Sequence, residues 1–254
     1  MHYGTDGSGM IYFLGDVHGH FGHVLEIVQR DRPAAIVFLG DVQAGRPLEV
    51  ELESILDLTE VWFIHGNHDT DSDADYDHLF NSTLAERNLH GRIAEVAGVR
   101  IAGLGGVFRG QVWAPPASWN YESQHEFSAR CGKGNHWRGG LPRKHYSTIF
   151  PEDYFQLVAE RADILVTHEA PSAHPYGFEA IDELARSLRV TKAFHGHHHD
   201  CLDYSHDWAR LGFAAFGVGY CGVTDMDGNC ILAGEFDEAR AMRGRVAQQG
   251  SGGV

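Results

Sequence analysis

Cysteine is scarce in this sequence, and the four cysteines are scattered. Cys131, Cys201, Cys221 and Cys230 form no Cys-x-x-Cys pair, so the sequence provides no disulfide framework. A chain of 254 residues is also long enough to bury a core without covalent staples. We therefore predict reduced thiols and a cytoplasmic location.

Long apolar runs are missing as well. No stretch approaches the roughly 18 consecutive apolar residues that a membrane helix needs, and residues 1–9 are polar and glycine-rich, with neither a basic start nor an apolar signal core. We expect neither a membrane span nor secretion.

Basic residues are much fewer than acidic residues. Lysine and arginine total 20 against 35 aspartates and glutamates, for a formal net charge of -15. A nucleic acid backbone or an anionic membrane would on average be repelled. We do not expect stable binding to nucleic acid.

Composition indicates one globular domain with a polar end. Hydrophobic residues make up 43% of the chain, enough for a single large core. We assign residues 1–238 to this domain and predict that the polar, glycine-rich residues 239–254 are disordered. Histidine is abundant, with 18 copies, and neutral imidazole is a common ligand for transition metals.

Polar residues follow a glycine at the ends of three apolar segments. Residues 10–14, 35–39 and 61–64 are predicted strands, and they run into Gly15-Asp16-Val17-His18, Gly40-Asp41 and Gly66-Asn67-His68-Asp69. Helical spacing in residues 20–30 and 50–58 predicts helices between the strands. This alternation is typical of an α/β sheet, which places ligands at the carboxyl ends of its strands. We expect these polar groups to converge on one edge.

The rest of the chain continues the pattern. An acidic loop, a short helix to about residue 87 and paired strands at 93–96 and 99–104 are predicted. Helices at 151–161 and 178–187 accompany strands that end at His168 and at His195-Gly196-His197-His198-His199. Residues 211–218, 222–226 and 231–236 are predicted as consecutive antiparallel strands, the last two joined by an Asp227-Gly228 hairpin turn.

Residues 107–150 form an inserted region without periodicity. They carry six basic and two acidic residues, a net charge of +4, and three of the five tryptophans. Long irregular segments in compact domains are often lids or binding loops, so one hypothesis is a cover for an anionic substrate. A solvated loop pinned by its aromatic residues is the alternative.

The strand-end residues provide more metal-binding side chains than one ion needs. They combine carboxylate, amide and imidazole donors: Asp16, His18, Asp41, Asn67, His68, His168, His197 and His199. A carboxylate such as Asp41 can bridge two ions, and this mixture suits manganese, our first choice, with iron or zinc as alternatives. Two such ions can hold a hydroxide and clamp an in-line displacement at phosphorus. The pattern therefore favours phosphoester hydrolysis.

The sequence resembles the calcineurin-like metallophosphoesterases. The five blocks of that family occur in order, as Gly15-Asp16-Val17-His18, Gly40-Asp41, Gly66-Asn67-His68-Asp69, His168 and Gly196-His197-His198-His199. They cover the chain from about residue 10 to 200, and each follows a predicted strand. The resemblance implies two mixed β-sheets packed as a sandwich with helices outside.

The resemblance also implies a division of roles. Asp16, His18 and His199 would hold one metal ion, Asn67, His168 and His197 the other, and Asp41 would bridge them, with a hydroxide between the metals as the nucleophile. His68 would donate a proton to the leaving oxygen or stabilise the transition state, and Asp69 would orient His68. A protonated imidazole near two cations needs such a carboxylate partner.

Other residues near the motifs are ambiguous. Arg109 is our candidate phosphate clamp, together with Asn67 as a substrate-binding residue, although a surface arginine is the alternative. Related phosphatases carry an Arg-Gly pair after the second block, and here the order is Gly45-Arg46, which puts a phosphate-binding role for Arg46 in doubt. We expect structural roles for His195 and His198, and supporting hydrogen bonds or solvent exposure for His20, His23 and His65.

The substrate class stays open. We expect a phosphomonoesterase acting on a small phosphorylated molecule or a nucleotide. A phosphodiesterase or nuclease, and an enzyme similar to the Ser/Thr protein phosphatases, are the alternatives. A metal-binding scaffold without catalysis is a further alternative, but its usual sign is a missing ligand or catalytic histidine, and every motif position is filled.

Overall fold

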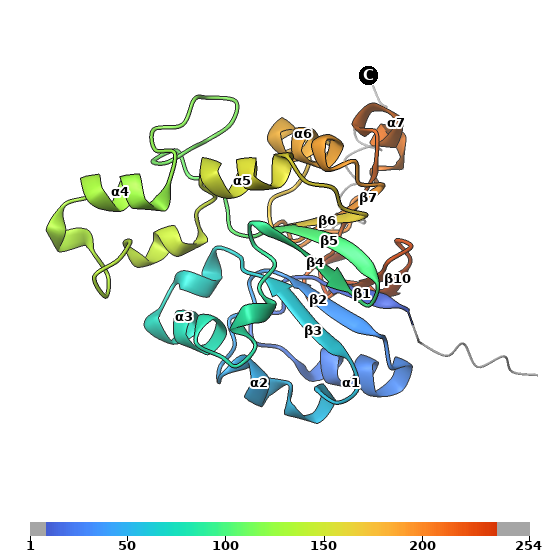
Figure 1. Cartoon of the computed structure of the whole chain (residues 1–254). Coiled ribbons are helices and arrows are strands. Elements are labelled where there is room, and N and C mark those ends of the chain that lie inside the picture. The colour runs from blue at the N-terminus through green and yellow to red at the C-terminus, as the bar shows by residue number, and fades with distance from the viewer. Residues whose placement is uncertain (1–8, 238–254) are drawn as a thin grey trace, which may run out of the picture.

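The computed structural model describes residues 9–237. Two five-stranded sheets pack face to face, with helices on both outer surfaces (Figure 1). This arrangement confirms the predicted sandwich of two mixed sheets. The segment predicted to be disordered, residues 239–254, lies outside the described residues. Within the described part of the chain, no helix combines the length and apolarity needed to cross a membrane.

The first sheet has the strand order β10-β9-β1-β2-β3. Its strands are β1 (Ile11–Leu14), β2 (Ala35–Leu39), β3 (Glu60–Ile64), β9 (Val223–Asp225) and β10 (Cys230–Leu232). The strands β1, β2 and β3 are parallel, whereas β9 pairs antiparallel with β1. Three successive parallel strands therefore end at the same edge, as the strand-end motifs require.

The second sheet has the order β4-β5-β6-β7-β8. It contains β4 (Arg92–Val96), β5 (Val99–Leu104), β6 (Ile164–Thr167), β7 (Lys192–His195) and β8 (Ala214–Gly217). The strands β5 to β8 are parallel, and β4 forms the predicted antiparallel pair with β5. The motifs that follow β6 and β7 thus lie at the carboxyl edge of this sheet.

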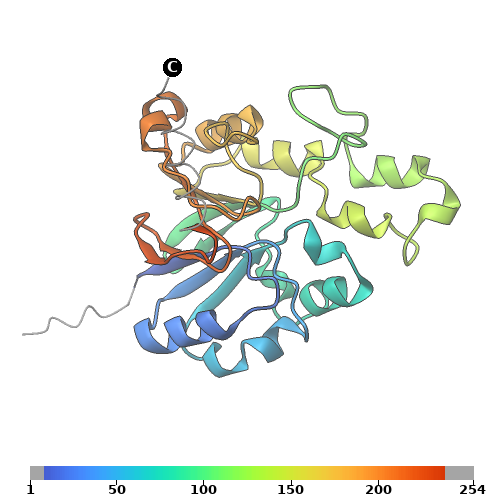
Figure 2. The same cartoon turned by 180° about the vertical axis from the view of Figure 1, so that it is seen from behind.

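Helices cover the outer face of each sheet (Figures 1 and 2). The helices of the described residues are α1 (Gly22–Asp31), α2 (Leu48–Glu51), α3 (Asp73–Phe80), α4 (Gln124–Arg130), α5 (Pro151–Val158), α6 (Glu179–Leu188) and α7 (Trp208–Leu211). Short 3₁₀ turns occur at η1 (Glu53–Ile55), η2 (His68–Thr70), η3 (Ala85–Arg87), η4 (Lys133–Asn135), η5 (Arg143–Ser147) and η6 (Ser205–Asp207). The helices α1 to α3 lie on the first sheet, and α5 to α7 lie on the second.

Strand alternation explains why the sheet residues are apolar on both faces. In β1, Ile11 and Phe13 point into the core between the sheets, whereas Tyr12 and Leu14 join the cluster that packs under the helices. Phe13 stacks on Phe194 of β7 with ring centroids 3.9 Å apart. This contact joins the two sheets directly below the edge that carries the motifs.

Three sequence predictions need correction. The predicted helix at 50–58 is a four-residue α2 followed by the 3₁₀ turn η1. The predicted acidic loop is largely the helix α3, because the Ser72 hydroxyl accepts a hydrogen bond from the Asp75 amide and the acidic first turn suits the helix dipole.

The third correction concerns the last strands. The strand β8 pairs in parallel with β7 in the second sheet, whereas β9 and β10 belong to the first. Alternation of apolar residues defines a strand but not its partner, so the predicted three-stranded antiparallel unit was wrong. The antiparallel pairing of β9 with β10 is confirmed.

The inserted region is more ordered than its sequence indicates. It contains α4, which Ser123 caps through the Glu126 amide, and it projects beside the sandwich (Figure 1). Val112, Trp113 and Phe127 are buried in the cluster that underlies α5 and α6. The region is therefore packed on the domain by its own apolar residues.

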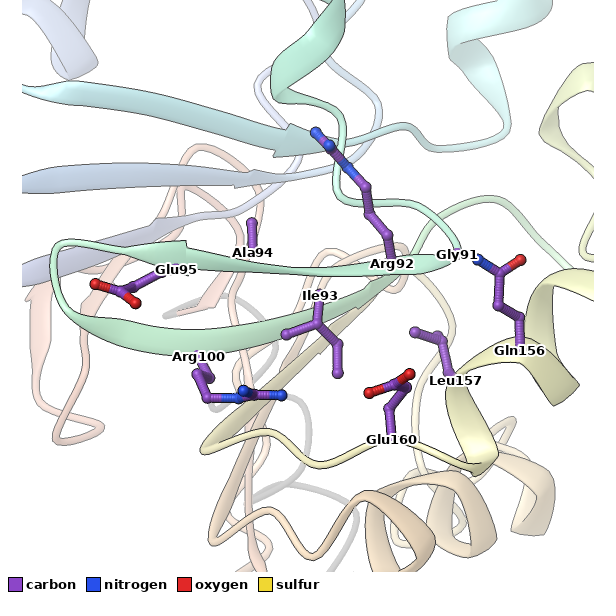
Figure 3. Close-up of a pocket in the computed structure, with 9 residues that line it drawn as sticks. All are labelled: Gly91, Arg92, Ile93, Ala94, Glu95, Arg100, Gln156, Leu157 and Glu160. Atoms are coloured by element: carbon purple, nitrogen blue, oxygen red, sulfur yellow. The ribbon is translucent and has the colours of Figure 1, made fainter.

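The outer side of the second sheet carries a shallow pocket. It has a volume of about 310 Å³ and lies between the edge strand β4, β5 and α5, with Ile93 and Leu157 facing across it (Figure 3). None of the residues predicted for the metal site lines it.

Candidate metal centre

The two sheets bring the predicted ligands together. Asp16 and His18 follow β1, Asp41 follows β2, and Asn67 follows β3, all in the first sheet. From the second sheet, His168 follows β6, and His197 and His199 follow β7. The carboxyl edges of both sheets therefore contribute to one cluster.

Two overlapping groups of donors form within this cluster. One consists of His18, Asp41 and His199, the other of Asp41, His168 and His197, and in each group the donor atoms lie within 4.8 Å of one another. The Nε2 atoms of His18 and His199 are 3.1 Å apart, and His168 Nε2 is 3.4 Å from Asp41 Oδ2. Asp41 belongs to both groups, the position that a bridging carboxylate would take.

Asp16 and Asn67 extend the two groups. Asp16 Oδ2 is 3.7 Å from His199 Nε2, and Asn67 Oδ1 is 3.3 Å from His168 Nε2. Asp16 is completely buried, and neither of its carboxylate oxygens has a hydrogen-bond partner of normal geometry among residues 9–237. Burial raises the pKa of Asp16 well above its usual range. A buried carboxylate without hydrogen-bond partners is suited to binding a cation.

His168 is held in the orientation that a ligand needs. Its Nδ1 lies 2.8 Å from the Leu39 carbonyl oxygen, which can only accept, so Nδ1 donates and Nε2 faces Asp41. Burial lowers the pKa of His168, but the carboxylates of Asp41 and Asp16 outweigh burial and raise it to about 10. Positive charge is thus favoured between these carboxylates, and a metal ion would provide it.

The other ligands are also prepared for binding. Burial lowers the pKa of His197 to about 3, which keeps its imidazole neutral. For Asp41, burial acts to raise the pKa, but the neighbouring His168 lowers it below its usual value. Neutral imidazoles and ionised carboxylates are the forms that bind metal.

The backbone at these positions is unusual. His18, Asp41, His197 and His199 have φ values of 42, 47, 70 and 56 degrees, which residues with a β-carbon seldom adopt. Such conformations cost roughly 1–3 kcal/mol each and concentrate at functional sites. The strand-end turns therefore hold these side chains inward at the expense of local strain.

Close packing explains the glycines of two motifs. A β-carbon on Gly66 would lie 2.2 Å from Asp41 Oδ1 and 2.6 Å from His168 Cε1. Gly40 has a φ of 104 degrees, and its β-carbon would lie 2.3 Å from His168 Nδ1. Only glycine leaves room for these two ligands.

His68 lies at the rim of the cluster, and Asp71 is its carboxylate partner. The Nδ1 atom of His68 is 2.5 Å from Asp71 Oδ2, and the His68 amide donates to Asp41 Oδ1 at 2.8 Å. Partial burial acts to lower the pKa of His68, but the Asp71 hydrogen bond and the charge of Asp41 raise it above its usual value. The protonated imidazole is therefore favoured.

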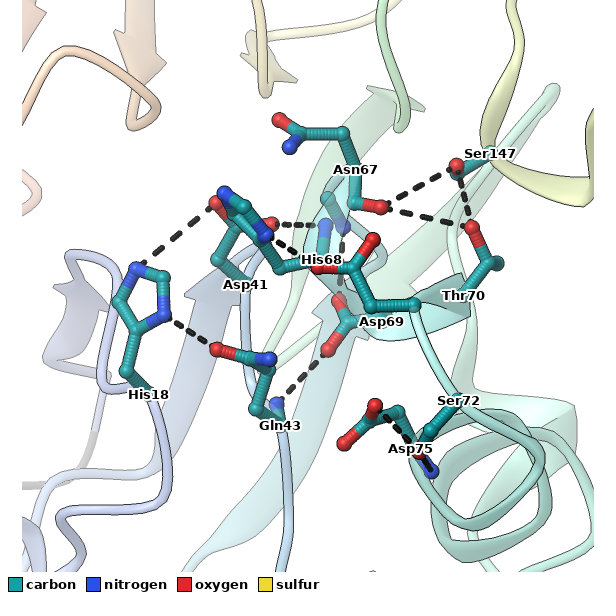
Figure 4. A network of polar contacts seen from close by, with 12 residues as sticks. His18, Asp41, Gln43, Asn67, His68, Asp69, Thr70, Ser72, Asp75 and Ser147 are labelled. Carbon is teal, nitrogen blue, oxygen red and sulfur yellow. Dashed lines mark hydrogen bonds and ion pairs between the residues drawn. The ribbon is translucent and has the colours of Figure 1, made fainter. Parts of the chain in front are cut away.

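Asp69 does not contact His68 as predicted. It is buried, and its two oxygens accept hydrogen bonds of 2.8 Å from the Gln43 and Gly66 amides (Figure 4). The 3₁₀ turn η2 directs residue 71, not residue 69, towards the imidazole. Asp69 instead connects the loops that follow β2 and β3, so its predicted role of orienting His68 needs correction.

Arg109 lies on the inserted region beside these loops. Its Nη2 atom donates to Ser147 Oγ at 3.3 Å, and Ser147 Oγ is 2.7 Å from Thr70 Oγ1 (Figure 4). Its buried Nε has no hydrogen-bond partner among the described residues, and burial lowers the pKa of Arg109. Arg46, by contrast, forms a surface ion pair with Glu51 at 2.9 Å.

The sequence patterns did not predict some of the residues that lie next to the site. Gln43 Oε1 accepts from His18 Nδ1 at 2.5 Å, which leaves Nε2 facing the cluster, and the Tyr220 ring lies 5.2 Å from that of His199. Gln43 could have been found from its position two residues after Asp41, as could Asp71 from its spacing of three from His68. No local pattern marks Tyr220.

The remaining histidines have other partners. His195 is buried and bonded to the Tyr204 hydroxyl at 3.1 Å, and His198 stacks on His174 with ring centroids 3.8 Å apart. His65 is buried against Asn88. These contacts agree with the structural and supporting roles expected for His195, His198 and His65.

Comparison with known proteins identifies the family. Residues 9–201 match the calcineurin-like phosphoesterase family, so the chain belongs to it. It is a metallophosphoesterase, a hydrolase of phosphoric esters that depends on metal. A protein of Haemophilus influenzae is 38% identical over 223 residues, covering 88% of this chain and 96% of that protein.

Solved structures show the same fold. The crystal structure of TT1561 of Thermus thermophilus matches with a TM-score of 0.55 at 12% identity, covering 89% of this chain and 99% of that one. A second crystal structure has a TM-score of 0.52 at 13% identity, covering 89% and 98%.

Proposed function

We propose that this protein is a cytoplasmic, manganese-dependent phosphomonoesterase acting on a small phosphorylated molecule or a nucleotide. The observation that carries the proposal is the pair of donor groups that share Asp41 and lie beside the His68–Asp71 pair. Iron or zinc would suit the same mixture of donors.

The ligands divide between the two groups. Asp16, His18 and His199 would hold one ion, Asn67, His168 and His197 the other, and Asp41 would contact both. The unpartnered, buried Asp16 and the inward-facing Nε2 of His168 support this assignment. When bound, the ions would polarise the phosphoryl oxygens and activate the attacking water.

The side chains at the rim would act on the substrate itself. His68, held protonated by Asp71, would donate a proton to the leaving oxygen. Asn67 and the guanidinium of Arg109 would bind the phosphoryl group. Ser147 holds Arg109 near the loop that carries Asn67 and His68.

The test uses p-nitrophenyl phosphate and bis(p-nitrophenyl) phosphate on one preparation. We expect hydrolysis that a chelator abolishes and manganese restores, with the monoester turned over faster than the diester. Turnover that resists the chelator, or none after reconstitution with manganese, iron or zinc, would refute metal-dependent catalysis here. A faster rate on the diester would replace the monoesterase proposal with a phosphodiesterase, and a panel of nucleotides and phosphopeptides would then define the substrate.

A further inference from the structure

A second pocket lies on the helical side of the second sheet, separate from the metal centre. It has a volume of about 630 Å³, within the usual range for small-molecule sites. The stretch between Trp113 and Trp119, α5 and the start of α6 form its walls, and none of the predicted site residues lines it. In Figures 1 and 2 the loop before α4 lies beside α5 and α6.

Aromatic side chains form much of this aromatic pocket. Trp113, Trp119, Phe155 and Phe178 all line it, and Trp119 stands edge-on to Phe155 with ring centroids 5.4 Å apart. Trp119 and Phe155 are 43% and 46% exposed. Large aromatic rings exposed inside a concave site are unusual unless they serve binding.

The charge of the aromatic pocket is negative. Glu179 and Glu183 line it from adjacent turns of α6, both are exposed, and no lysine or arginine is among the lining residues. Neither carboxylate has an ion-pair partner within residues 9–237. The helix dipole favours Glu179 in the first turn, but Glu183 lies beyond that turn and gains little from it.

We infer that the aromatic pocket binds a small organic cation. The faces of aromatic rings attract an ammonium group, and Trp is the strongest of them. The two carboxylates add opposite charge next to those rings, whereas a phosphate or other anion would be repelled. A ligand with an apolar body and one ammonium group matches both features.

Phe108, at the start of the inserted region, connects the aromatic pocket to the metal centre. The ring of Phe108 contacts those of Trp113 and Phe178, with centroids 5.1 and 4.8 Å away. The Phe108 amide donates to Glu169 Oε1 at 3.0 Å, next to His168. Binding must therefore be measured directly and not through activity, so that a failure of the proposed phosphomonoesterase reaction does not affect the result.

Choline and its neutral isostere 3,3-dimethyl-1-butanol provide a matched test, because they differ mainly in charge. Isothermal titration of the full chain, with and without manganese, is expected to show saturable choline binding that the metal does not change. The alcohol should bind about tenfold more weakly, the size of effect that a cation–π contact gives.

Variants locate the site. Glu179→Gln combined with Glu183→Gln should weaken choline binding and reduce the preference for choline over the alcohol, and Trp119→Ala should weaken choline binding about tenfold. Glu53→Gln removes an exposed carboxylate from the 3₁₀ turn η1, which is not part of the aromatic pocket, and should leave binding unchanged. Circular dichroism would check that each variant is folded. Equal binding of the two probes, no saturable binding, or unchanged choline affinity in the folded pocket variants would overturn the inference.

Discussion

At the scale of single residues, His68 is the side chain whose role is most easily separated from metal binding. Its backbone amide donates a hydrogen bond to Asp41, while its side chain is 45% exposed. His68→Ala should keep the metal content and lose about 100-fold or more in rate on an alkyl phosphate, the usual contribution of a general acid. The loss on p-nitrophenyl phosphate should be smaller, because nitrophenolate leaves without a proton. Loss of metal, or a full rate on alkyl esters, would show that the role is misassigned.

Variants of Asp71 and Asp69 test which carboxylate orients His68 and which one supports the loops. Asp71→Asn weakens the hydrogen bond and removes the charge by which Asp71 helps to raise the pKa of His68, so the alkaline limb of the pH–rate profile should move to lower pH. Asp69→Asn should leave that limb in place but lower the free energy of unfolding by about 1–3 kcal/mol. The Asn side chain has one acceptor oxygen where Asp has two, so one of the two backbone amides that donate to Asp69 would lose its hydrogen bond. Rates across pH and urea unfolding would measure both effects. A shift of the limb in the Asp69 variant instead would restore the original assignment.

At the scale of elements, the glycines at the strand ends determine whether the ligands can meet. Gly66→Ala would place a β-carbon within 2.6 Å of Asp41 and His168, and we expect metal affinity to fall at least about tenfold. Gly22→Ala is the matched control, since a β-carbon at the start of α1 meets nothing within 4 Å. Metal content measured by mass spectrometry after dialysis should be lower in the Gly66 variant than in the Gly22 variant. Normal metal content in the Gly66 variant would contradict the packing argument.

At the scale of the whole molecule, a bound metal would link the two sheets. Asp16, His18, Asp41 and Asn67 come from the first sheet, and His168, His197 and His199 from the second. Manganese at about 100 times its Kd should therefore stabilise the fold by about 2.7 kcal/mol for each ion bound, which corresponds to a rise in Tm of about 5–10 °C per ion. Differential scanning calorimetry would measure it. Asp41→Ala should lose this rise, and the same rise in that variant would show that manganese binds elsewhere.

Much of the site could be predicted because its residues lie in short local patterns. Each of the five motifs follows a strand, and a strand end is set by nearby apolar residues and a glycine. The sequence therefore determined β1, β2 and β3 to within one residue, the end of β6, the edge at which the polar groups gather, and the family. It also predicted Asp16 and Asp41 as neighbours, because parallel strands end together.

The tertiary structure decided what depends on contacts between distant segments. Which sheet β8 joins follows from packing that no local pattern encodes. Whether Asp69 or Asp71 faces His68 depends on the 3₁₀ turn η2 and on the loops that Asp69 connects. The same is true of Tyr220 beside His199, and of the aromatic pocket, whose walls come from three separate segments of the chain. Local chemistry fixed the motifs, whereas burial of two sheets against each other fixed which side chains meet.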